Sequence, residues 1–487
     1  MSAESNWIIL QSDNHAQAFA GCYGHPFIKT PALDRIAARG VRFDRAYSAS
    51  PLCCPARAAI ATGRFPHQTG FWDNATPYDG SVGSWMHRLR DEGHRVVSIG
   101  KLHFRSTDDD NGWTEEISPM HVVGGVGGLI GLLRWNDEEP SRKAQWRLYT
   151  EETGAGDTKY QVYDREIATR AVHWLREHAR DRSKPWCLYV SFVSPHPPFT
   201  VPARLLDLYP ADGIPLPPAY DAAGRPRHPA LEHLRQKMGF QEIEDPALLR
   251  RIVAAYCALI TYLDECIGAV MQTVESLGLL ASTNVLYTSD HGESVGSHGL
   301  FGKYTLLDPS VKVPLLWSGP GVPAGKACKR FTSHVDLFPT IVRGMGAALQ
   351  PGDADLPGIP LGDAVGENGN DRCGFAEYHA AGSRSGAFMI LDWPWKLIYY
   401  VGMPNQLFRL DEDPHELHDL AAVQPAVVGR LEAVLRSRLD PEAVDGRAKS
   451  MQRLVAERNG GTDAILRRGE FAYSPPPGVA AAMRTVG

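Results

Sequence analysis

Short, largely apolar runs that stop abruptly at polar residues recur along the chain. The clearest of them are residues 7–10, 95–99, 186–193 and 284–288. Runs without alternation of apolar and polar residues are typical of strands buried on both faces of a parallel sheet. Between them lie segments with apolar residues at helical spacing, such as 31–40 and 250–277. This alternation predicts an α/β domain with a mostly parallel sheet.

Reactive side chains follow these predicted strands. Ligands of a parallel sheet bind outside the carboxyl ends of its strands, and those ends lie along one edge. The residues near the ends of the four runs that could carry chemistry are Asp13, Asn14, Lys101, His103, His196, Asp290 and His291. We therefore expect carboxylates, imidazoles and an ammonium group to meet in one site.

The last part of the chain has a different pattern. Its predicted elements are a linker at 351–369, strands at 388–391 and 395–400, a helix at 424–438 and an extended arm at 471–487. We expect a catalytic α/β domain over residues 1–370 and a smaller α+β subdomain over residues 371–487. A Gly-rich run at 124–131 matches neither a phosphate loop nor a dinucleotide fingerprint, so we expect a mobile loop there.

The composition is that of a globular protein, with 43% hydrophobic and 22% charged residues among 487. The net charge of −6 comes without a basic run, so we expect no nucleic-acid partner, whereas a small anionic substrate stays possible. The apolar run at 7–10 is too short for a signal peptide core or a membrane span, and we expect a cytoplasmic protein with no membrane partner. The eight cysteines follow no framework spacing, which favours reduced thiols.

Two adjacent cysteines, Cys53 and Cys54, precede Pro55 and Arg57. A disulfide between neighbours strains the backbone, and a zinc site needs further thiolates or imidazoles at short spacing, which do not follow. A bare thiolate nucleophile, its pKa lowered by Arg57, is a third interpretation. Two small buried side chains at a helix start are a fourth. The residues alone leave these interpretations open.

The pattern Cys53-x-Pro-x-Arg57, followed by the Thr-Gly-Arg sequence at 62–64, resembles the signature of type I sulfatases, the formylglycine-dependent family of the alkaline phosphatase superfamily. Further motifs follow in that family's order, at 12–15, 100–104, 194–196, 289–293, Lys303 and 411–417. The resemblance covers most of residues 6–345 and is nearest to choline sulfatases and phosphonate monoester hydrolases. It implies an alkaline-phosphatase-like fold, in which helices sandwich a mostly parallel sheet and a smaller C-terminal α+β subdomain follows.

The resemblance implies that a formylglycine-generating enzyme oxidises Cys53 to formylglycine, whereas Cys54 only packs. One hydroxyl of the hydrated aldehyde, ionised on a divalent cation, attacks the sulfur of a small sulfate monoester and expels the alcohol. The second hydroxyl then loses its proton, the aldehyde reforms and sulfate leaves. The implied protein is a sulfuric ester hydrolase of the arylsulfatase-like type.

The implied metal ligands are an oxygen of modified Cys53 and the side chains of Asp13, Asn14, Asp290 and His291. This oxygen-rich set suits Ca²⁺, with Mn²⁺ and Mg²⁺ as alternatives. Many relatives carry Asp at the position of Asn14, so the site here has one negative charge fewer and a lower expected affinity for the cation. Taken singly, Asp13 and Asp290 also fit turn residues that close strands.

The resemblance assigns roles to the other polar residues of the motifs. Arg57 holds the hydrated formylglycine, Lys101 and Lys303 bind the sulfate oxygens, His103 takes the proton when sulfate leaves, His196 protonates or stabilises the leaving oxygen, and Asn74 faces the nucleophile and the substrate. Guanidinium and ammonium groups suit anionic oxygens, and imidazoles titrate near neutrality. Packing positions fit Trp72, Glu377 and His379 better than a place in a leaving-group pocket.

Two other functions fit the same residues. A hydrolase of phosphonate monoesters or phosphodiesters is the first, because either tetrahedral anion could occupy one cradle. An inactive binding protein that keeps the fold is the second, although a degraded site would have lost some ligands and every expected position is filled here. We expect a homodimer or homotetramer, because the proline-rich arm and a basic helix at 447–468 could pack on a neighbour.

Overall fold

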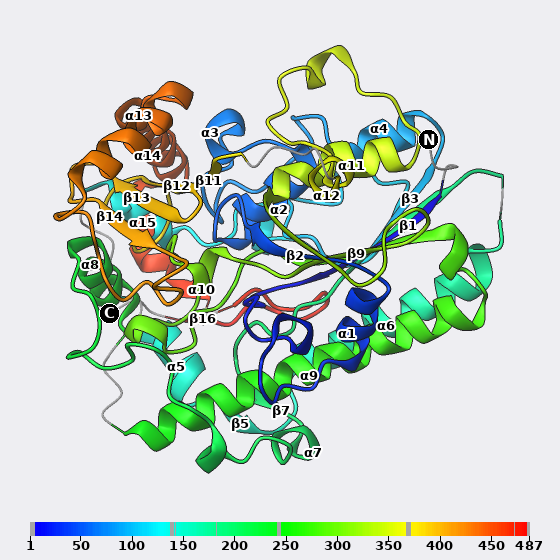
Figure 1. The fold of residues 1–487 in the computed structure, drawn as a ribbon, viewed down its shortest axis with the longest axis horizontal. Helices are drawn as coiled ribbons and strands as arrows, with labels where there is room; N and C mark the ends of the chain where they lie inside the picture. Colours follow the sequence, from blue (N-terminus) through cyan, green and yellow to red (C-terminus); the bar gives the residue numbers. More distant parts are fainter. Residues whose placement is uncertain are drawn as a thin grey trace.

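The computed structural model describes residues 5–136, 141, 143–181, 183–240, 245–366, 372–471 and 473–484. An eight-stranded sheet runs through the centre of the molecule (Figure 1). Its strands are β1 (Asn6–Ser12), β2 (Gly40–Tyr47), β3 (Arg95–Lys101), β4 (Glu115–Met120), β6 (Trp186–Ser191), β8 (Thr283–Ser289), β9 (Leu315–Ser318) and β10 (Lys326–Ser333). They lie in the order β10-β2-β9-β8-β1-β6-β3-β4, and only β9 runs antiparallel to its neighbours. This is the mostly parallel sheet that the sequence predicts.

The four strands predicted from the apolar runs are neighbours at the centre of this sheet. Ile9 of β1 pairs with Tyr189 of β6 on one side and with Leu286 of β8 on the other. Every residue of β6 and β8 is buried, which explains why these strands are apolar without alternation. Because the strands run in step, their carboxyl ends meet at one edge of the sheet.

Helices cover both faces of the sheet, as the predicted sandwich requires (Figure 1). Ile8 and Leu10 of β1 pack in one layer, together with α1 (Pro31–Ala38), α6 (Lys159–His178) and α9 (Pro246–Ser276). Trp7 and Ile9 pack in the other layer, together with α2 (Cys53–Thr62), α4 (Trp85–Asp91), α11 (Leu337–Gly344) and α12 (Leu361–Val365). The alternation of side chains along a strand separates the two layers.

The long helix α9 lies inside the protein. Within the described part of the chain it is the one helix with the length and hydropathy to cross a membrane, and 83% of its most apolar window is buried. Asp245 accepts a hydrogen bond from the backbone of Ala247 and caps the helix, and Pro246 occupies its first turn. Asp264 accepts from the backbone N–H groups of Ala32 and Leu33, which ties α9 to the start of α1. Its burial is that of a core helix.

A second, antiparallel sheet follows in the last part of the chain. It contains β11 (Gly374–Tyr378), β12 (Ala387–Asp392), β13 (Trp395–Tyr400) and β14 (Gln406–Arg409). The helices α13 (Pro425–Arg438), α14 (Pro441–Arg458) and α15 (Gly461–Arg468) follow it. The predicted strand pair is therefore β12 and β13, and the predicted α+β character is confirmed. A domain boundary at residues 370 and 371 stays a prediction and lies outside the described residues.

Short elements join these layers. They are α3 (Pro66–Thr69), α5 (Lys143–Thr150), α7 (Ala203–Leu206), α8 (Pro229–Met238), α10 (Asp308–Val311), the paired strands β5 (Gly154–Ala155) and β7 (Thr200–Val201), and 3₁₀ turns that include η3 (Ile130–Asn136). The predicted linker at 351–369 differs from the structure, because α12 falls within it. Leu361 and Ala364 of α12 are buried in the core, a tertiary contact that the Pro and Gly content hides. Residues 367–369 lie outside the described residues.

The Gly-rich run at 124–131 also differs from the expected mobile loop. Leu129 and Ile130 are buried in a small core that includes residues of α14 and α15. Gly127 has a φ of 65°, and a Cβ there would lie 2.1 Å from the backbone oxygen of Asn74. Glycine is required at this position because it permits both the backbone conformation and the close approach.

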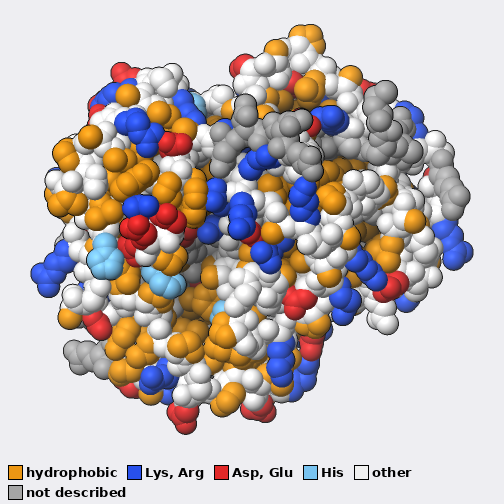
Figure 2. Space-filling model, viewed as in Figure 1, with side chains coloured by type: hydrophobic (Ala, Val, Ile, Leu, Met, Phe, Trp, Pro, Cys, Tyr) orange, Lys and Arg blue, Asp and Glu red, His pale blue; other side chains and the backbone are white. Residues whose placement is uncertain are grey.

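The predicted arm folds back toward the middle of the molecule instead of extending away from it (Figure 1). Its strands β15 (Glu470–Phe471) and β16 (Met483–Arg484) pair antiparallel. Arg484 forms an ion pair with Glu152 at 3.2 Å. On the face drawn in Figure 2, acidic, basic and apolar side chains are interspersed.

Candidate active site

The helix α2 carries Cys53 to the carboxyl edge of the central sheet. Cys53 is its first residue, and all ten of its residues are buried. Arg57 lies one turn further on, so the thiol and the guanidinium share one face of the helix. Gly63 ends the helix in the left-handed conformation, with its N–H donating to the carbonyl of Ala59. The Cys-x-Pro-x-Arg pattern is thus the first turn of a buried helix.

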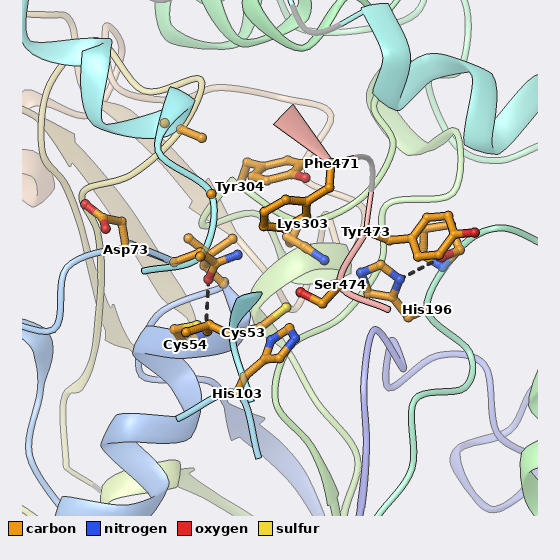
Figure 3. Close-up of a pocket in the computed structure, with 18 of the residues that line it drawn as sticks. Cys53, Cys54, Asp73, His103, His196, Lys303, Tyr304, Phe471, Tyr473 and Ser474 are labelled. Atoms are coloured by element: carbon orange, nitrogen blue, oxygen red, sulfur yellow. Dashed lines mark hydrogen bonds between the residues drawn. The ribbon is translucent and has the colours of Figure 1, made fainter. Parts of the chain in front are cut away.

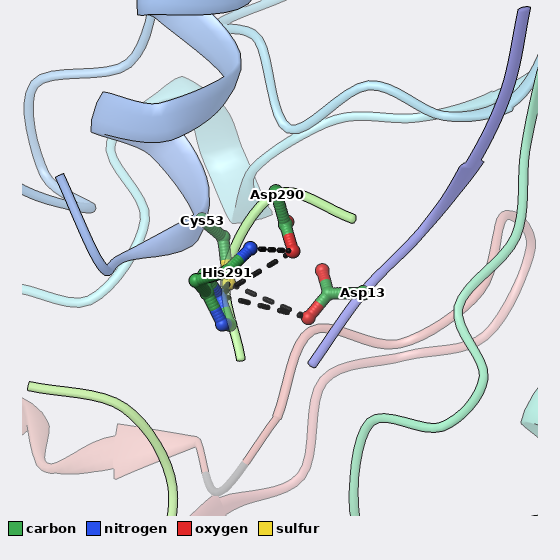
Figure 4. A group of neighbouring side chains, drawn as sticks. All are labelled: Asp13, Cys53, Asp290 and His291. Carbon is green, nitrogen blue, oxygen red and sulfur yellow. Dashed lines mark hydrogen bonds and ion pairs between the residues drawn. The ribbon is translucent and has the colours of Figure 1, made fainter. Parts of the chain in front are cut away.

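Four potential ligand residues meet at this point (Figure 4). One ligand atom each from Asp13, Cys53, Asp290 and His291 lies within 4.8 Å of every other. The Sγ of Cys53 lies 3.2 Å from Nε2 of His291 and 3.8 Å from Oδ1 of Asp13. Asp13 and Asp290 directly follow β1 and β8, which are paired neighbours, so the sheet register itself brings the two carboxylates together. The structure therefore assembles four of the five predicted metal ligands.

Two cations bind the carboxylates of this group. Arg57 donates from Nε to Oδ2 of Asp290 at 2.8 Å and from Nη2 to Oδ2 of Asp13 at 3.2 Å. Its Nη1 donates to the backbone oxygen of Lys101 at 2.7 Å and to Oγ of Ser191 at 3.0 Å. The ammonium of Lys101 lies 2.5 Å from Oδ2 of Asp13. Arg57 therefore uses its fork to fix the geometry of both carboxylates.

The two carboxylates differ in their electrostatic environments. Burial alone would raise the pKa of Asp13, but the positive charge of Lys101, supported by His196, His291 and Arg57, holds it well below its usual value. Burial, together with the negative charge of Asp13, raises the pKa of Asp290 to about 7. Additional positive charge near the two carboxylates would therefore stabilise their ionised forms, and a cation bound between them would supply it.

The remaining predicted ligand, Asn14, has two hydrogen bonds in the structure. Its Oδ1 accepts from Nζ of Lys303 at 3.0 Å, and its Nδ2 donates to Oε2 of Glu293 at 2.7 Å. Its backbone has a φ of 65°, a strained conformation for a residue other than glycine. A metal contact of Asn14 stays a prediction. The same contacts position Lys303, which is buried and lies near groups that can carry negative charge.

The imidazole of His291 is oriented for metal binding. Its Nδ1 lies 3.0 Å from the carbonyl oxygen of Gly292, which can only accept, so Nδ1 carries the proton. The lone pair of Nε2 then faces the group. Two buried carboxylates and a neutral imidazole held by a backbone carbonyl form a donor set that fits a divalent cation.

His103 stands at the pocket with both ring nitrogens unbonded among the described residues. It follows β3, is 5% exposed and has a φ of 54°. Burial, with the positive charges of Lys101 and Arg57, lowers its pKa well below 6.5. Buried polar atoms without partners are rare outside functional sites. His103 is therefore a neutral imidazole that can accept a proton from a bound group.

His196 also lines the pocket, beside Tyr473 and Ser474 (Figure 3). Its Nδ1 lies 2.7 Å from the carbonyl oxygen of Pro197, so Nδ1 carries the proton and Nε2 the lone pair. Burial, followed by the positive charge of Lys303, lowers its pKa well below 6.5. A proton on Nε2 requires added negative charge nearby, and a bound anionic ester supplies it.

Asn74 contacts the helix that carries Cys53. Its Oδ1 accepts from the backbone N–H of Cys54 at 3.1 Å, and both residues line the pocket. Trp72, Glu377 and His379, for which we expect packing positions, are buried. The carboxylate of Glu377 lies 2.9 Å from Nδ1 of His67 and 3.0 Å from Nε2 of His379. The ring of Trp72 meets the ring of His379 edge-on. These three do not line the pocket around Cys53.

The pocket above Cys53 also contains residues that sequence reasoning missed (Figure 3). They are Asp73, Tyr149, Tyr304, Phe471, Tyr473 and Ser474. None belongs to a recognisable motif, and they come from distant parts of the chain. Glu293 belongs to the motif at 289–293 but has no role assigned by the resemblance, and its carboxylate accepts hydrogen bonds from Asn14 and from the backbone of Gly302. No disulfide joins any of the eight cysteines.

Comparisons with known proteins establish the family of the chain. The sulfatase family model matches residues 5–347. Choline-sulfatase of Rhizobium meliloti (strain 1021) is 32% identical over 446 residues, which are 88% of this chain and 85% of that protein. Arylsulfatase K of Homo sapiens is 26% identical, over 89% of this chain and 82% of the relative. The crystal structure of phosphonate monoester hydrolase of Agrobacterium radiobacter gives a TM-score of 0.71 at 23% identity, covering 89% of this chain and 95% of that chain.

The fold is that of the matched phosphonate monoester hydrolase, and the family match places the chain among the hydrolases of the alkaline phosphatase superfamily. The chain belongs to the sulfatase family, and it is a sulfuric ester hydrolase.

Proposed function

We propose that the protein hydrolyses small sulfate monoesters with a formylglycine made from Cys53 and a divalent cation held by Asp13, Asp290 and His291. One observation carries the proposal. The first residue of α2 lies within contact distance of a buried carboxylate and imidazole donor set, at the floor of a pocket that also holds Lys303 and His196. A nucleophile, a cation site and anion-binding groups thus converge on one space.

The bound cation and the formylglycine would together supply a nucleophilic oxygen at neutral pH and an aldehyde from which sulfate can be eliminated. Ca²⁺ is the ion we propose, because carboxylate-rich sites suit hard cations, with Mn²⁺ and Mg²⁺ as the alternatives. Asp13 and Asp290 would hold the ion, and Arg57 fixes both carboxylates.

Charge balance explains how the site attracts an anionic ester. Three buried carboxylates, Asp13, Asp290 and Glu293, face three buried cations, Arg57, Lys101 and Lys303. A divalent cation would leave a net positive charge, which favours sulfate and the charge that develops during transfer. Lys303 lines the pocket, and among the described residues its ammonium donates to the amide oxygen of Asn14, so its other N–H groups can donate to the ester.

Two histidines, His103 and His196, line the pocket that contains Cys53. His103 is neutral and unbonded among the described residues, which suits removal of a proton when sulfate leaves. His196 presents the Nε2 lone pair when neutral. The negative charge of a bound ester raises its pKa, and the protonated ring can then donate to the leaving oxygen.

The choline-sulfatase relative makes choline sulfate the first ester to test. Aromatic rings attract quaternary ammonium groups through their faces, and Tyr149, Tyr304, Phe471 and Tyr473 line the pocket. The neutral isostere 3,3-dimethylbutyl sulfate has the same shape without the charge. A higher kcat/KM for choline sulfate supports a cationic substrate, and equal values contradict it.

The deciding experiment compares initial rates on 4-nitrophenyl sulfate and 4-nitrophenyl phenylphosphonate. Protein co-expressed with a formylglycine-generating enzyme and loaded with Ca²⁺ should cleave the sulfate ester faster. A phosphonate rate higher by orders of magnitude would establish the alternative hydrolase, and no turnover of either ester would favour the inactive binding protein.

Further parts of the proposal concern the protein's surroundings. We propose a cytoplasmic enzyme that requires a formylglycine-generating enzyme for maturation and that forms a homodimer or homotetramer. Its partners would include neither nucleic acid nor membrane. Sedimentation velocity of the purified chain tests the oligomeric state.

A further inference from the structure

The C-terminal hairpin, defined here as β15, Tyr473, Ser474 and β16, forms part of the active-site pocket. Phe471, Tyr473 and Ser474 line the same pocket as Cys53 and His196 (Figure 3). These three residues are half-buried in the described structure. They lie beyond the residues matched by the sulfatase family model, which end at residue 347.

Tyr160, near the start of α6, connects this hairpin to His196. Its hydroxyl donates to the backbone oxygen of Ser474 at 2.6 Å. Its ring packs against the ring of Tyr473 with centroids 5.1 Å apart, and it meets the ring of His196 edge-on at 5.9 Å. The ion pair of Arg484 with Glu152 anchors the other strand of the hairpin. The hairpin is therefore held against the active site at two points.

The lining of the pocket combines charged and aromatic side chains. The carboxylates that would bind the metal lie beside Cys53, and Lys303 of the lining would bind the sulfate group. Phe471 and Tyr473 add aromatic rings to the pocket wall, and Tyr149 and Tyr304 add two more. With the sulfate group beside Cys53 and Lys303, the organic part of the ester extends toward the rest of the lining, in which these rings are the largest apolar side chains.

We propose that Phe471 and Tyr473 of the C-terminal hairpin form the leaving-group wall, and that Tyr473 is a specificity-determining residue. It selects esters whose organic part is large enough, and apolar or cationic enough, to pack on its ring. This inference rests on the proposed function for the placement of the sulfate group. Smaller esters, such as ethyl sulfate, do not reach the ring.

The test compares ethyl sulfate with 3,3-dimethylbutyl sulfate in the Tyr473→Ala enzyme. We expect kcat/KM for the larger ester to fall about tenfold, mainly through KM, while that for ethyl sulfate stays within about twofold. The inhibition constant of inorganic sulfate should not change. Tyr473→Phe keeps the ring and should match the wild type. Met483→Ala is the matched control, because Met483 lies on β16, is 45% exposed and does not line the pocket.

Other outcomes overturn the inference. Equal losses for both esters, or a weaker binding of inorganic sulfate, would show that Tyr473 acts through His196 or through the fold. Unchanged kinetics for both esters would show that the ring does not contact the substrate. If the wild type cleaves phenylphosphonates and not sulfates, the proposed substrate class fails separately. The ethyl and 3,3-dimethylbutyl esters of phenylphosphonate then make the same comparison, and an unaltered ratio between them in Tyr473→Ala overturns this inference alone.

Discussion

Two buried clusters of charged side chains in this protein are built differently. The catalytic cluster consists of Asp13, Arg57, Lys101 and Asp290 at the carboxyl edge of the sheet. The junction cluster consists of Asp308, Lys396 and Glu416, where the second sheet meets the large domain.

The junction cluster is closed on itself. Nζ of Lys396 lies 2.6 Å from a carboxylate oxygen of Asp308 and 2.6 Å from one of Glu416, and the other oxygen of Glu416 accepts from the backbone of Asp308. The catalytic cluster borders a pocket where His103 has no hydrogen-bond partner among the described residues. Similar buried ion pairs therefore serve two purposes: the closed cluster stabilises a junction, and the open one presents groups to a ligand.

The largest loss of activity is expected from Cys53→Ala. It removes the residue that we propose becomes the nucleophile, and we expect kcat/KM to fall on the order of 10⁴-fold or more. The helix and the ion pairs of the catalytic cluster remain, so the midpoint of urea unfolding should move little. Cys54→Ala is the matched control and should retain most of the activity. Comparable losses in both variants would contradict the assignment of Cys53.

A smaller loss of activity is expected from Lys303→Met. The variant removes an ammonium group from the pocket while keeping a side chain of similar length, and we expect kcat to fall about 10²- to 10³-fold. Lys329→Met, at an exposed position of β10, is the control. An effect on KM alone would show that Lys303 binds the ground state and does not stabilise the transition state.

At the junction cluster, Lys396→Met should lower stability by about 3–5 kcal/mol, because it leaves two carboxylates without their buried partner. Urea unfolding measures the change, and the remaining folded enzyme should keep its KM. A loss below about 1 kcal/mol would mean that the junction is held by packing alone.

The smallest effect is expected at Glu377, which forms a second closed cluster with His67 and His379. Burial alone would raise its pKa, but His67 and His379 lower it to about 2 from 4.5. A depressed carboxylate pKa adds stability that is present above pH 4.5 and lost as the pH falls toward 2. The stability gap between the wild type and Glu377→Gln should therefore shrink by about 2 kcal/mol between pH 6 and pH 3.

Urea unfolding at several pH values follows this gap. Glu275→Gln, which breaks an exposed pair with Arg39, should give a gap below about 0.5 kcal/mol at every pH. If the stability difference between the wild type and Glu377→Gln stayed constant from pH 6 to pH 3, the negative charge of Glu377 would not be the cause of that difference.

The sequence predicted the parts of the site that lie at the ends of strands or directly after them. Asp13, Lys101 and Asp290 stand at positions where strand order alone places side chains at one edge, and the motif around Cys53 identified the helix that faces them. The four central strands and α9 were predicted because buried elements leave long apolar patterns in a sequence.

The rest depends on contacts between distant residues. Tyr473 lines the pocket where Tyr160 contacts the hairpin, and no local pattern records that contact. The junction cluster joins Asp308 to Lys396 across the boundary between two sheets. The glycine content of the run at 124–131 predicted a mobile loop. The prediction was wrong because Leu129 and Ile130 are buried against helices more than 300 residues later in the chain, a contact that the sequence of the run does not record.

The central claim is that residue 53 carries an aldehyde in the active enzyme. Mass spectrometry of the tryptic peptide spanning residues 46–57 tests it most directly, in protein from cells that contain a formylglycine-generating enzyme. The account predicts a peptide lighter by the mass difference between a thiol and an aldehyde. The fraction of this lighter peptide should rise in proportion to the specific activity of the preparation. A fully active preparation in which residue 53 is only cysteine would contradict it.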